Sequence, residues 1–410
     1  MPYANSHDSY GAVTKTFHWL TALLILTVIP LGLIASDLAH AVRNPEIATT
    51  DADTARAALL FSLHKTIGVT IFFTALLRIL WALGQPRTGL LNGDKPAEAW
   101  LAHTIHWLLY GSLVIVPLTG WIHHAATSGF APIWWPFGQS LPFVPKDETL
   151  AQVTGTLHYI LQWVLIGAIT LHILGAIKHH SIDRDATLRR MLPGRTRATP
   201  TQRQPGHVLP VITALAVWAL AIGGGAAAGL FPQAGSEPTQ TAALEAVESD
   251  WQVQNGSLDI IVSQMGSDVS GSFSDWTAEI AYSEEPDADG KHGDVTVTVS
   301  IPSLTLGSVT DQAMGPDYFA AETHPTATFN ADIMAQEDGH VADGTLTIKE
   351  QSVPVEMPFT LTIDGDTATA TANGALSVDR RDFNIGLGTK DEGTLGFTVD
   401  ISFDLTAKRQ

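Results

Sequence analysis

Four histidines lie in long apolar stretches of this 410-residue sequence, where polar side chains are rare. His18 opens one stretch, His64 opens the next, and His158 and His172 share a third. In a helix, the interval from His158 to His172 places both on nearly one face, about 21 Å apart along the axis. Burying an imidazole in hydrocarbon costs free energy unless a partner satisfies it, so these residues are functional candidates.

Two histidines on one helix, each facing a histidine from another helix, form the arrangement expected for two bis-histidine haems. Haem iron accepts neutral imidazole as an axial ligand, and the macrocycle fits an apolar slot between helices. The sequence contains no cysteine, which excludes covalent haem attachment, iron–sulfur clusters, disulfides and thiol catalysis. We therefore expect two non-covalently held haem b groups.

Five apolar stretches are long enough to cross a bilayer, which requires roughly 20 residues. We expect a transmembrane four-helix domain over residues 1–200 and a fifth transmembrane helix over 207–231. The stretches cover approximately residues 13–36, 60–84, 99–125, 150–178 and 208–231.

The loop charges predict the orientation of these helices. The segment 178–203 is rich in Arg, and the loop after the second stretch adds Arg87 and Lys95, whereas the other two loops carry few cations. Because Lys and Arg are enriched in cytoplasmic loops, we expect the N-terminus in the cytoplasm of a bacterial inner-membrane protein. The C-terminal part would then be periplasmic. His18 and His172 would share the cytoplasmic level, and His64 and His158 the periplasmic level.

A linker over residues 232–247 precedes a part with a different periodicity, residues 248–410. Residues 394–407 alternate apolar and polar side chains over six repeats, residues 293–301 do the same, and 354–363 follow less strictly. Alternation over many short strands separated by turn signals predicts an antiparallel sandwich or barrel, and the long final strand favours a barrel. The expected fold is an all-α transmembrane bundle followed by an all-β antiparallel barrel.

Charge is divided unevenly between these two parts. Residues 235–410 hold 7 Lys and Arg against 30 Asp and Glu, whereas the preceding residues hold 15 against 11. Phosphate binding needs clustered cations, so we expect no nucleic-acid partner. The acidic part should be repelled by anionic lipid headgroups.

The first half resembles the bacterial cytochrome b561 family over residues 9–197. The resemblance implies axial haem ligands at His18, His64, His158 and His172, and quinone as a redox partner. Some members of that family pass electrons from superoxide to ubiquinone. The matching motifs are FHWL at 17–20, LHKTIG at 63–68, LLRILWAL at 76–83, AHTIHWLLY at 102–110 and DATLRRMLPG at 185–194.

Four other side chains belong to the expected haem or quinone environment. His103 and His106 match a family motif and could line a haem propionate or quinone pocket, or be ordinary interface residues. Lys65 adjoins His64 and could hold a propionate or attract an anionic substrate, or simply reach the headgroups. Arg78 is expected near the membrane interface.

The second half resembles the YceI-like family, lipocalin-like barrels that bind polyisoprenoid chains. The motifs are DWQV at 250–253, GSFSDWTAEI at 271–280, DYFAAETHPTATF at 317–329, DGTLTIKEQSVPVEMPFTL at 343–361 and RRDFNIGLG at 380–388. A small apolar barrel can hold one extended chain, although a filled, ligand-free barrel is the alternative. No nucleophile–base pair or metal cluster stands out, so we expect no catalysis in this half. The expected lining residues are Phe273, Trp276, Phe319, Phe329, Phe359 and Phe397.

Together these observations predict a membrane-anchored electron-transfer protein that exchanges electrons with quinone. The ubiquinone tail is itself a polyisoprenoid, which would link the two halves. Two alternatives stay open. One is a membrane-tethered lipid carrier in which haem is incidental, and the other is the cytochrome b subunit of a hydrogenase or similar dehydrogenase.

Overall fold

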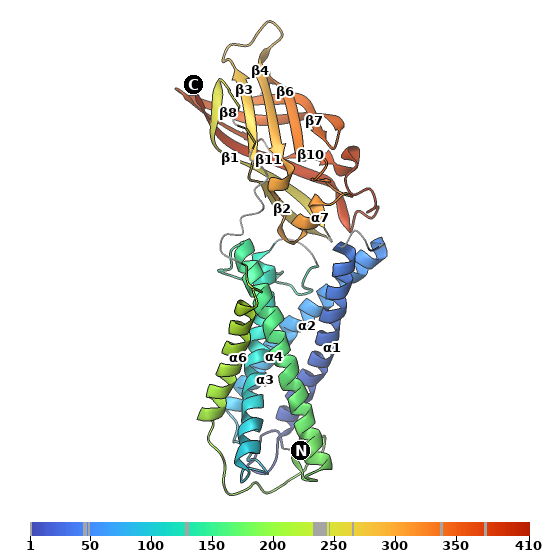
Figure 1. Ribbon diagram of the computed structural model, residues 1–410, viewed down its shortest axis with the longest axis vertical. Coiled ribbons are helices and arrows are strands. Elements are labelled where there is room, and N and C mark those ends of the chain that lie inside the picture. The colour runs from blue at the N-terminus through green and yellow to red at the C-terminus, as the bar shows by residue number, and fades with distance from the viewer. Residues whose placement is uncertain are drawn as a thin grey trace. The chain divides into compact units, whose positions relative to one another are not determined.

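The computed structural model describes residues 2–43, 47, 50–127, 131–232, 244–245, 247–264, 266–336, 339–372 and 375–410 (Figure 1). Two compact units make up the chain, one built on long helices and one that contains the whole sheet. The first comprises Met1–Ala35, Leu60–Thr127 and Ile133–Gly235, and the second Ser36–Leu59, Ser128–Pro132 and Ser236–Gln410.

Five helices in the described residues are long and apolar enough to cross a membrane, which confirms the expected number of spans. The first two are longer than their apolar stretches, because residues 37–43 and 51–59 continue with alanine and other good helix formers. The five are α1 (Ala12–Arg43), α2 (Asp51–Leu83), α3 (Pro96–Ala126), α4 (Glu148–Ser181) and α6 (Val208–Ala227), with the short α5 (Thr187–Met191) after α4.

The fifth long helix packs against α3 and α4. Trp218 of α6 donates a hydrogen bond from Nε1 to Ser112 Oγ of α3 at 3.2 Å. Ala214 is buried in a cluster with Leu108 of α3 and Ala168 of α4. α6 is therefore an integral part of the helical unit.

The second unit is an 11-stranded sheet in which every paired strand is antiparallel, as the alternating pattern predicted. The strand order is β3-β4-β6-β7-β8-β9-β11-β1-β2-β5, with β10 beside β11. The strands are β1 (Trp251–Gln264), β2 (Ser267–Phe273), β3 (Trp276–Tyr282), β4 (Lys291–Ser300), β5 (Leu304–Thr305), β6 (Thr326–Gln336), β7 (Gly339–Ile348), β8 (Gln351–Asp364), β9 (Thr367–Ala372), β10 (Leu376–Asp379) and β11 (Leu395–Arg409).

β1 and β11, the first and last strands in the chain, are neighbours inside the sheet, in the register Ile260 to Ile401, and the two edges of the sheet are β3 and β5. The sheet curls into a barrel because its β3 edge comes back against β1 (Figure 1). Ser249, just before β1, connects across to β3. Its hydroxyl accepts a hydrogen bond from the Ile280 backbone N–H at 2.7 Å and lies 3.1 Å from the Ile280 carbonyl oxygen. Short helices, including α7 (Thr310–Met314) and the 3-10 helix η3 (Arg380–Phe383), connect some of the strands. This is the antiparallel barrel fold expected from the sequence.

Candidate functional site

The helical unit brings the four intramembrane histidines together as two pairs. The ring centroids of His18 on α1 and His172 on α4 lie 6.0 Å apart. Those of His64 on α2 and His158 on α4 lie 6.2 Å apart. We refer to these as the His18–His172 pair and the His64–His158 pair. Since His158 and His172 are 14 residues apart on α4, the pairs lie at two levels, about 21 Å apart.

The spacing within each pair fits a metal ion between the rings. Two metal–nitrogen bonds of about 2 Å, plus about 1.2 Å from each ligating nitrogen to its ring centre, place two axial rings about 6.4 Å apart. The two observed separations, 6.0 and 6.2 Å, agree with this value. Both separations therefore leave room for a metal ion between the two rings.

Hydrogen bonds orient the rings of the His64–His158 pair. His64 Nδ1 lies 2.9 Å from the Val28 carbonyl oxygen, and His158 Nδ1 lies 2.8 Å from the Val116 carbonyl oxygen. Because a carbonyl can only accept, each Nδ1 carries the proton and each Nε2 keeps its lone pair for a metal. His18 Nδ1 is buried with no hydrogen-bond partner among the described residues.

Two glycines make room for the same two rings. A Cβ atom at Gly32 of α1 would lie 2.6 Å from His64 Cε1, and one at Gly120 of α3 would lie 2.9 Å from His158 Nδ1. Any larger residue would push the imidazole out of its position. The positions of the His64 and His158 rings therefore depend on neighbouring glycines as well as on the histidines themselves.

The two other histidines that were expected in the haem environment, His103 and His106, lie beside different partners. The His106 ring lies 5.4 Å from His172, beside the His18–His172 pair. His103 instead faces His207, with ring centroids 4.3 Å apart. His207 was not among the residues expected from the sequence, although it stands at the start of the last apolar stretch, where a histidine could have been noted.

The two cations of this group lie at different places in the bundle. The Arg78 guanidinium carbon lies 5.2 Å from the centre of the Tyr110 ring, over its aromatic face. Lys65 is only 5% exposed and directly follows the ligand candidate His64 in α2. A buried cation beside the His64–His158 pair could attract an anion.

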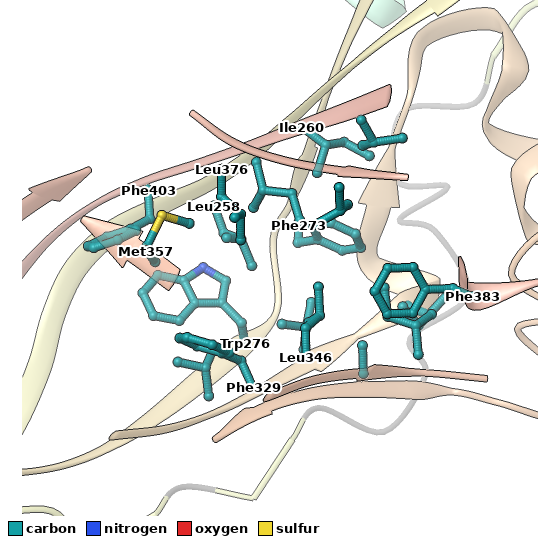
Figure 2. A pocket seen from close by; sticks show the side chains of 18 of the residues that line it. Leu258, Ile260, Phe273, Trp276, Phe329, Leu346, Met357, Leu376, Phe383 and Phe403 are labelled. Atoms are coloured by element: carbon teal, nitrogen blue, oxygen red, sulfur yellow. The ribbon is translucent and has the colours of Figure 1, made fainter. Parts of the chain in front are cut away.

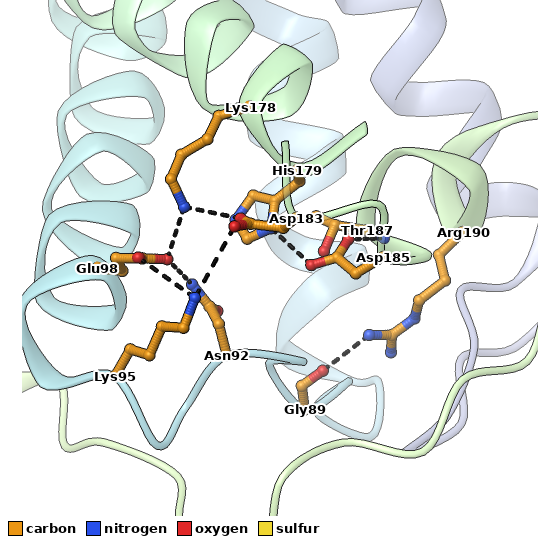
Figure 3. Close-up of polar contacts among 10 residues, drawn as sticks. All are labelled: Gly89, Asn92, Lys95, Glu98, Lys178, His179, Asp183, Asp185, Thr187 and Arg190. Atoms are coloured by element: carbon orange, nitrogen blue, oxygen red, sulfur yellow. Dashed lines mark hydrogen bonds and ion pairs between the residues drawn. The ribbon is translucent and has the colours of Figure 1, made fainter. Parts of the chain in front are cut away.

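A polar cluster ties the start of α3 to the end of α4 (Figure 3). Possible ligand atoms of Glu98, His179 and Asp183 lie within 4.8 Å of one another, as a metal site would require. Lys178 Nζ, however, lies 3.0 Å from Glu98 and 2.7 Å from Asp183, and its hydrogen bond lowers the pKa of Asp183. The cluster is therefore a partly exposed ion-pair network, of modest stability in water. Nearby, the buried Arg190 donates to the Gly89 carbonyl at 2.9 Å.

The barrel encloses an apolar cavity of about 290 Å³ (Figure 2). Its lining includes five of the six residues expected from the sequence, namely Phe273, Trp276, Phe319, Phe329 and Phe359.

The sixth expected residue, Phe397, is not among the lining residues. β11 is irregular between the residues that pair with Val262 and Gln264. There the Phe397 ring lies 3.8 Å from the Arg381 guanidinium carbon. Phe383 lines the cavity instead, from the 3-10 helix η3, where no alternation marks it in the sequence.

Comparison with known proteins separates the two halves in the same way. Residues 9–194 match the prokaryotic cytochrome b561 family and residues 251–407 match the YceI-like domain. Cytochrome b561 homolog 2 of Escherichia coli (strain K12) is 29% identical over 197 residues, which cover 47% of this chain and 95% of that protein. A probable superoxide oxidase CybB of Yersinia pestis is 27% identical over 188 residues, 46% of this chain and 97% of that protein. The crystal structure of Burkholderia cenocepacia BcnA is 30% identical, with a TM-score of 0.34, and covers 37% of this chain and 96% of that one.

Proposed function

Because residues 9–194 belong to the prokaryotic cytochrome b561 family and residues 251–407 form a YceI-like domain, we propose that this multi-pass bacterial membrane protein is a di-haem quinone-linked cytochrome. The family implies haem b. The observation that carries the number two is the pair of histidine separations, 6.0 and 6.2 Å, at two levels of the bundle. His18 and His172 would hold one haem, and His64 and His158 the other.

Bound haem supplies one-electron transfer, and the protein supplies ligation, orientation and an apolar surrounding. The carbonyls of Val28 and Val116 hold the rings of His64 and His158 and keep their Nε2 atoms unprotonated. Apolar residues between the levels, including Ile25, Ile71 and Leu113, keep water out of the bundle.

The proposed reaction is the oxidation of superoxide coupled to the reduction of ubiquinone. Two superoxide anions each lose one electron and leave as O₂, and one ubiquinone gains the two electrons and two protons to become ubiquinol. The name of the Yersinia pestis relative supports superoxide as the donor. Lys65, buried beside His64, would attract the anion to that level of the bundle.

We assign the barrel the role of holding a polyisoprenoid chain. Its cavity is lined largely by apolar side chains, and the YceI-like family supports this ligand class. Burial of ten isoprenoid carbons at about 25 cal/mol per Å² gives several kcal/mol, enough for micromolar binding after association costs. The tail of ubiquinol, the reduced product, would meet these requirements, which connects the barrel to the quinone pool.

The orientation belongs to the same proposal. Arg-rich residues 178–203 favour a cytoplasmic N-terminus in the inner membrane and a periplasmic barrel. The His64–His158 pair would then lie at the periplasmic level, where superoxide enters.

The test follows haem oxidation state by rapid-mixing absorbance spectroscopy on the purified full-length protein. Generated superoxide should reduce the oxidised haems, and ubiquinone-1 should oxidise the reduced haems. Failure of every quinone tested to exchange electrons would contradict the proposal and favour a tethered lipid carrier.

Substitution of Lys65 tests the reduction of the haems by superoxide separately from their oxidation by quinone. Lys65→Gln should slow reduction by superoxide about tenfold, since steering by charge changes association rates by 10–10³. Oxidation by ubiquinone-1 should be unchanged, and Lys65→Arg should restore the superoxide rate. Lys146→Gln, in the loop before α4, provides a matched control in which one cation is also removed. Equal slowing in both Gln variants would contradict the role of Lys65.

A further inference from the structure

We infer that the barrel selects an isoprenoid with an uncharged, hydroxyl-bearing head, and that Gln264 binds that head. This inference rests on the proposed function, because it takes the cavity to hold an isoprenoid chain. The candidate ligand class comprises polyprenyl alcohols, polyprenyl phenols and polyprenyl quinols. The class it excludes comprises polyprenyl phosphates and diphosphates.

The cavity offers no available cation among its described lining residues. Arg380 is the one charged side chain of that lining, and it is 2% exposed. A guanidinium has five N–H donors. All five are used by backbone carbonyl oxygens: Nε by Gly396 at 2.9 Å, Nη1 by Ile385 at 2.7 Å and Gly386 at 2.6 Å, and Nη2 by Thr389 at 2.8 Å and Leu395 at 3.3 Å.

The Arg380 site is also closed sterically. Gly386 has a φ of +61°, and a Cβ atom there would lie 2.9 Å from Arg380 Nη1 and 3.1 Å from Tyr318 Cε1. Arg380 therefore holds the segment 385–396 in place and has no donor left for a phosphate. A phosphate group in this cavity would be a buried charge without a partner, which is strongly unfavourable.

An uncharged head needs only a hydrogen bond, and Gln264 provides one. Gln264 ends β1, lines the cavity and is 9% exposed. Its Oε1 atom is buried with no hydrogen-bond partner among the described residues. A buried amide oxygen without a donor is costly, so a ligand hydroxyl that donates to it would be favoured.

The three other amide and phenol side chains in the lining, Gln312, Tyr318 and Tyr282, each have a hydrogen-bond partner. Gln312 Nε2 donates to Tyr318 Oη at 3.1 Å. At the far end of β3, Tyr282 Oη lies 3.2 Å from His340 Nε2. Among the described amide and phenol groups of the lining, Gln264 is thus the one with a buried side-chain atom that has no hydrogen-bond partner.

The experiment compares two photoactivatable probes with the same tail, benzophenone-tagged geranylgeraniol and benzophenone-tagged geranylgeranyl diphosphate. Each is crosslinked to the purified full-length protein, and labelled peptides are quantified by mass spectrometry. We expect the alcohol to label peptides of residues 251–407 at least tenfold more than the diphosphate. Gln264→Leu should lower labelling by the alcohol, and Gln252→Leu, an exposed position on the same strand, should not.

A gain-of-function variant makes the test independent of a simple loss of folding. Gln264→Lys places a cation at the proposed head site and should shift the preference toward the diphosphate. Equal or stronger labelling by the diphosphate in the unmodified protein would overturn the inference while leaving isoprenoid binding intact. Unchanged labelling by the alcohol in Gln264→Leu would overturn the role of Gln264. If neither probe labelled residues 251–407, both the inference and the proposed role of the barrel would fail.

Discussion

The Nδ1 atom of His158 lies 2.8 Å from the carbonyl oxygen of Val116, one helix away on α3. Because a carbonyl can only accept, the contact fixes the tautomer of the ring and leaves Nε2 with its lone pair. Gly120, one turn further along α3, lets the ring come this close. The position of the His158 ring is therefore set by α3, which contributes none of the four proposed ligands.

Gly120→Ala tests this dependence without changing a ligand. The added Cβ would lie 2.9 Å from His158 Nδ1 and should displace the ring, although alanine favours the helix by roughly 1 kcal/mol. We expect haem content to fall by about half, as judged by Soret absorbance per protein. Gly167→Ala on α4, where nothing lies within 4 Å, should keep full haem content. Equal haem content in both variants would argue against the glycine as a determinant.

Sidedness can be checked with protease and intact spheroplasts. If the N-terminus is cytoplasmic, external protease should cut the chain near residues 232–247 and release a soluble acidic fragment. The same fragment should not appear from inverted vesicles, where the barrel would be enclosed. Release from inverted vesicles alone would show that the proposed orientation is reversed.

Arg380→Lys should destabilise the barrel by about 3 kcal/mol, because a lysine can satisfy at most three of the five carbonyls and leaves the others buried and unpaired. Hydrogen–deuterium exchange of β8 and β11 should accelerate accordingly. Arg381→Lys is the matched control, since Arg381 is an exposed neighbour paired with Asp379, and such pairs contribute at most about 1 kcal/mol. Comparable exchange in the two variants would contradict the structural role of Arg380.

Burial, and secondarily the neighbouring His292, lowers the pKa of His340 in the barrel. Below about pH 6.5, His340 binds a proton in the unfolded chain but stays neutral in the folded barrel. The free energy of unfolding should therefore fall as the pH drops from about 6.5 toward the lowered pKa of His340. Above that pH, His340 should add no pH dependence. His340→Gln keeps a polar group near Tyr282 but does not titrate. In this variant the unfolding midpoint, measured as a function of pH, should decrease less steeply below about pH 6.5. If the midpoint decreased equally steeply in both proteins, the acid destabilisation would come from other groups and not from His340.

The histidine pairing was accessible from the sequence because it follows from chain direction. Successive helices cross a bilayer in opposite directions, so the first and fourth helices run antiparallel. The start of the first helix is then level with the end of the fourth, which places His18 beside His172. The barrel could also be predicted from the sequence, because strict alternation of apolar and polar residues over 394–407 fits a half-buried strand and few other structures. The pairing depends on the number and direction of the apolar spans and the barrel on alternation along the strands, and a single sequence shows both.

Other features depend on local irregularity that periodicity does not record. Phe397 fits the alternation of β11, yet a break in register turns it toward Arg381. Arg380 reads as a surface charge in the sequence, and its burial arises only when the segment 385–396 folds around it. Gln264 acquires its unpartnered oxygen from the same packing.

Haem stoichiometry tests the central claim most directly. Pyridine haemochrome analysis of the fully loaded, purified protein should give two haem b per chain. His18→Ala and His64→Ala should each leave one haem, and the double variant should leave none, with helix content by circular dichroism unchanged. A ratio near one in the unmodified protein, or loss of both haems from either single substitution in a folded protein, would contradict the two-site account.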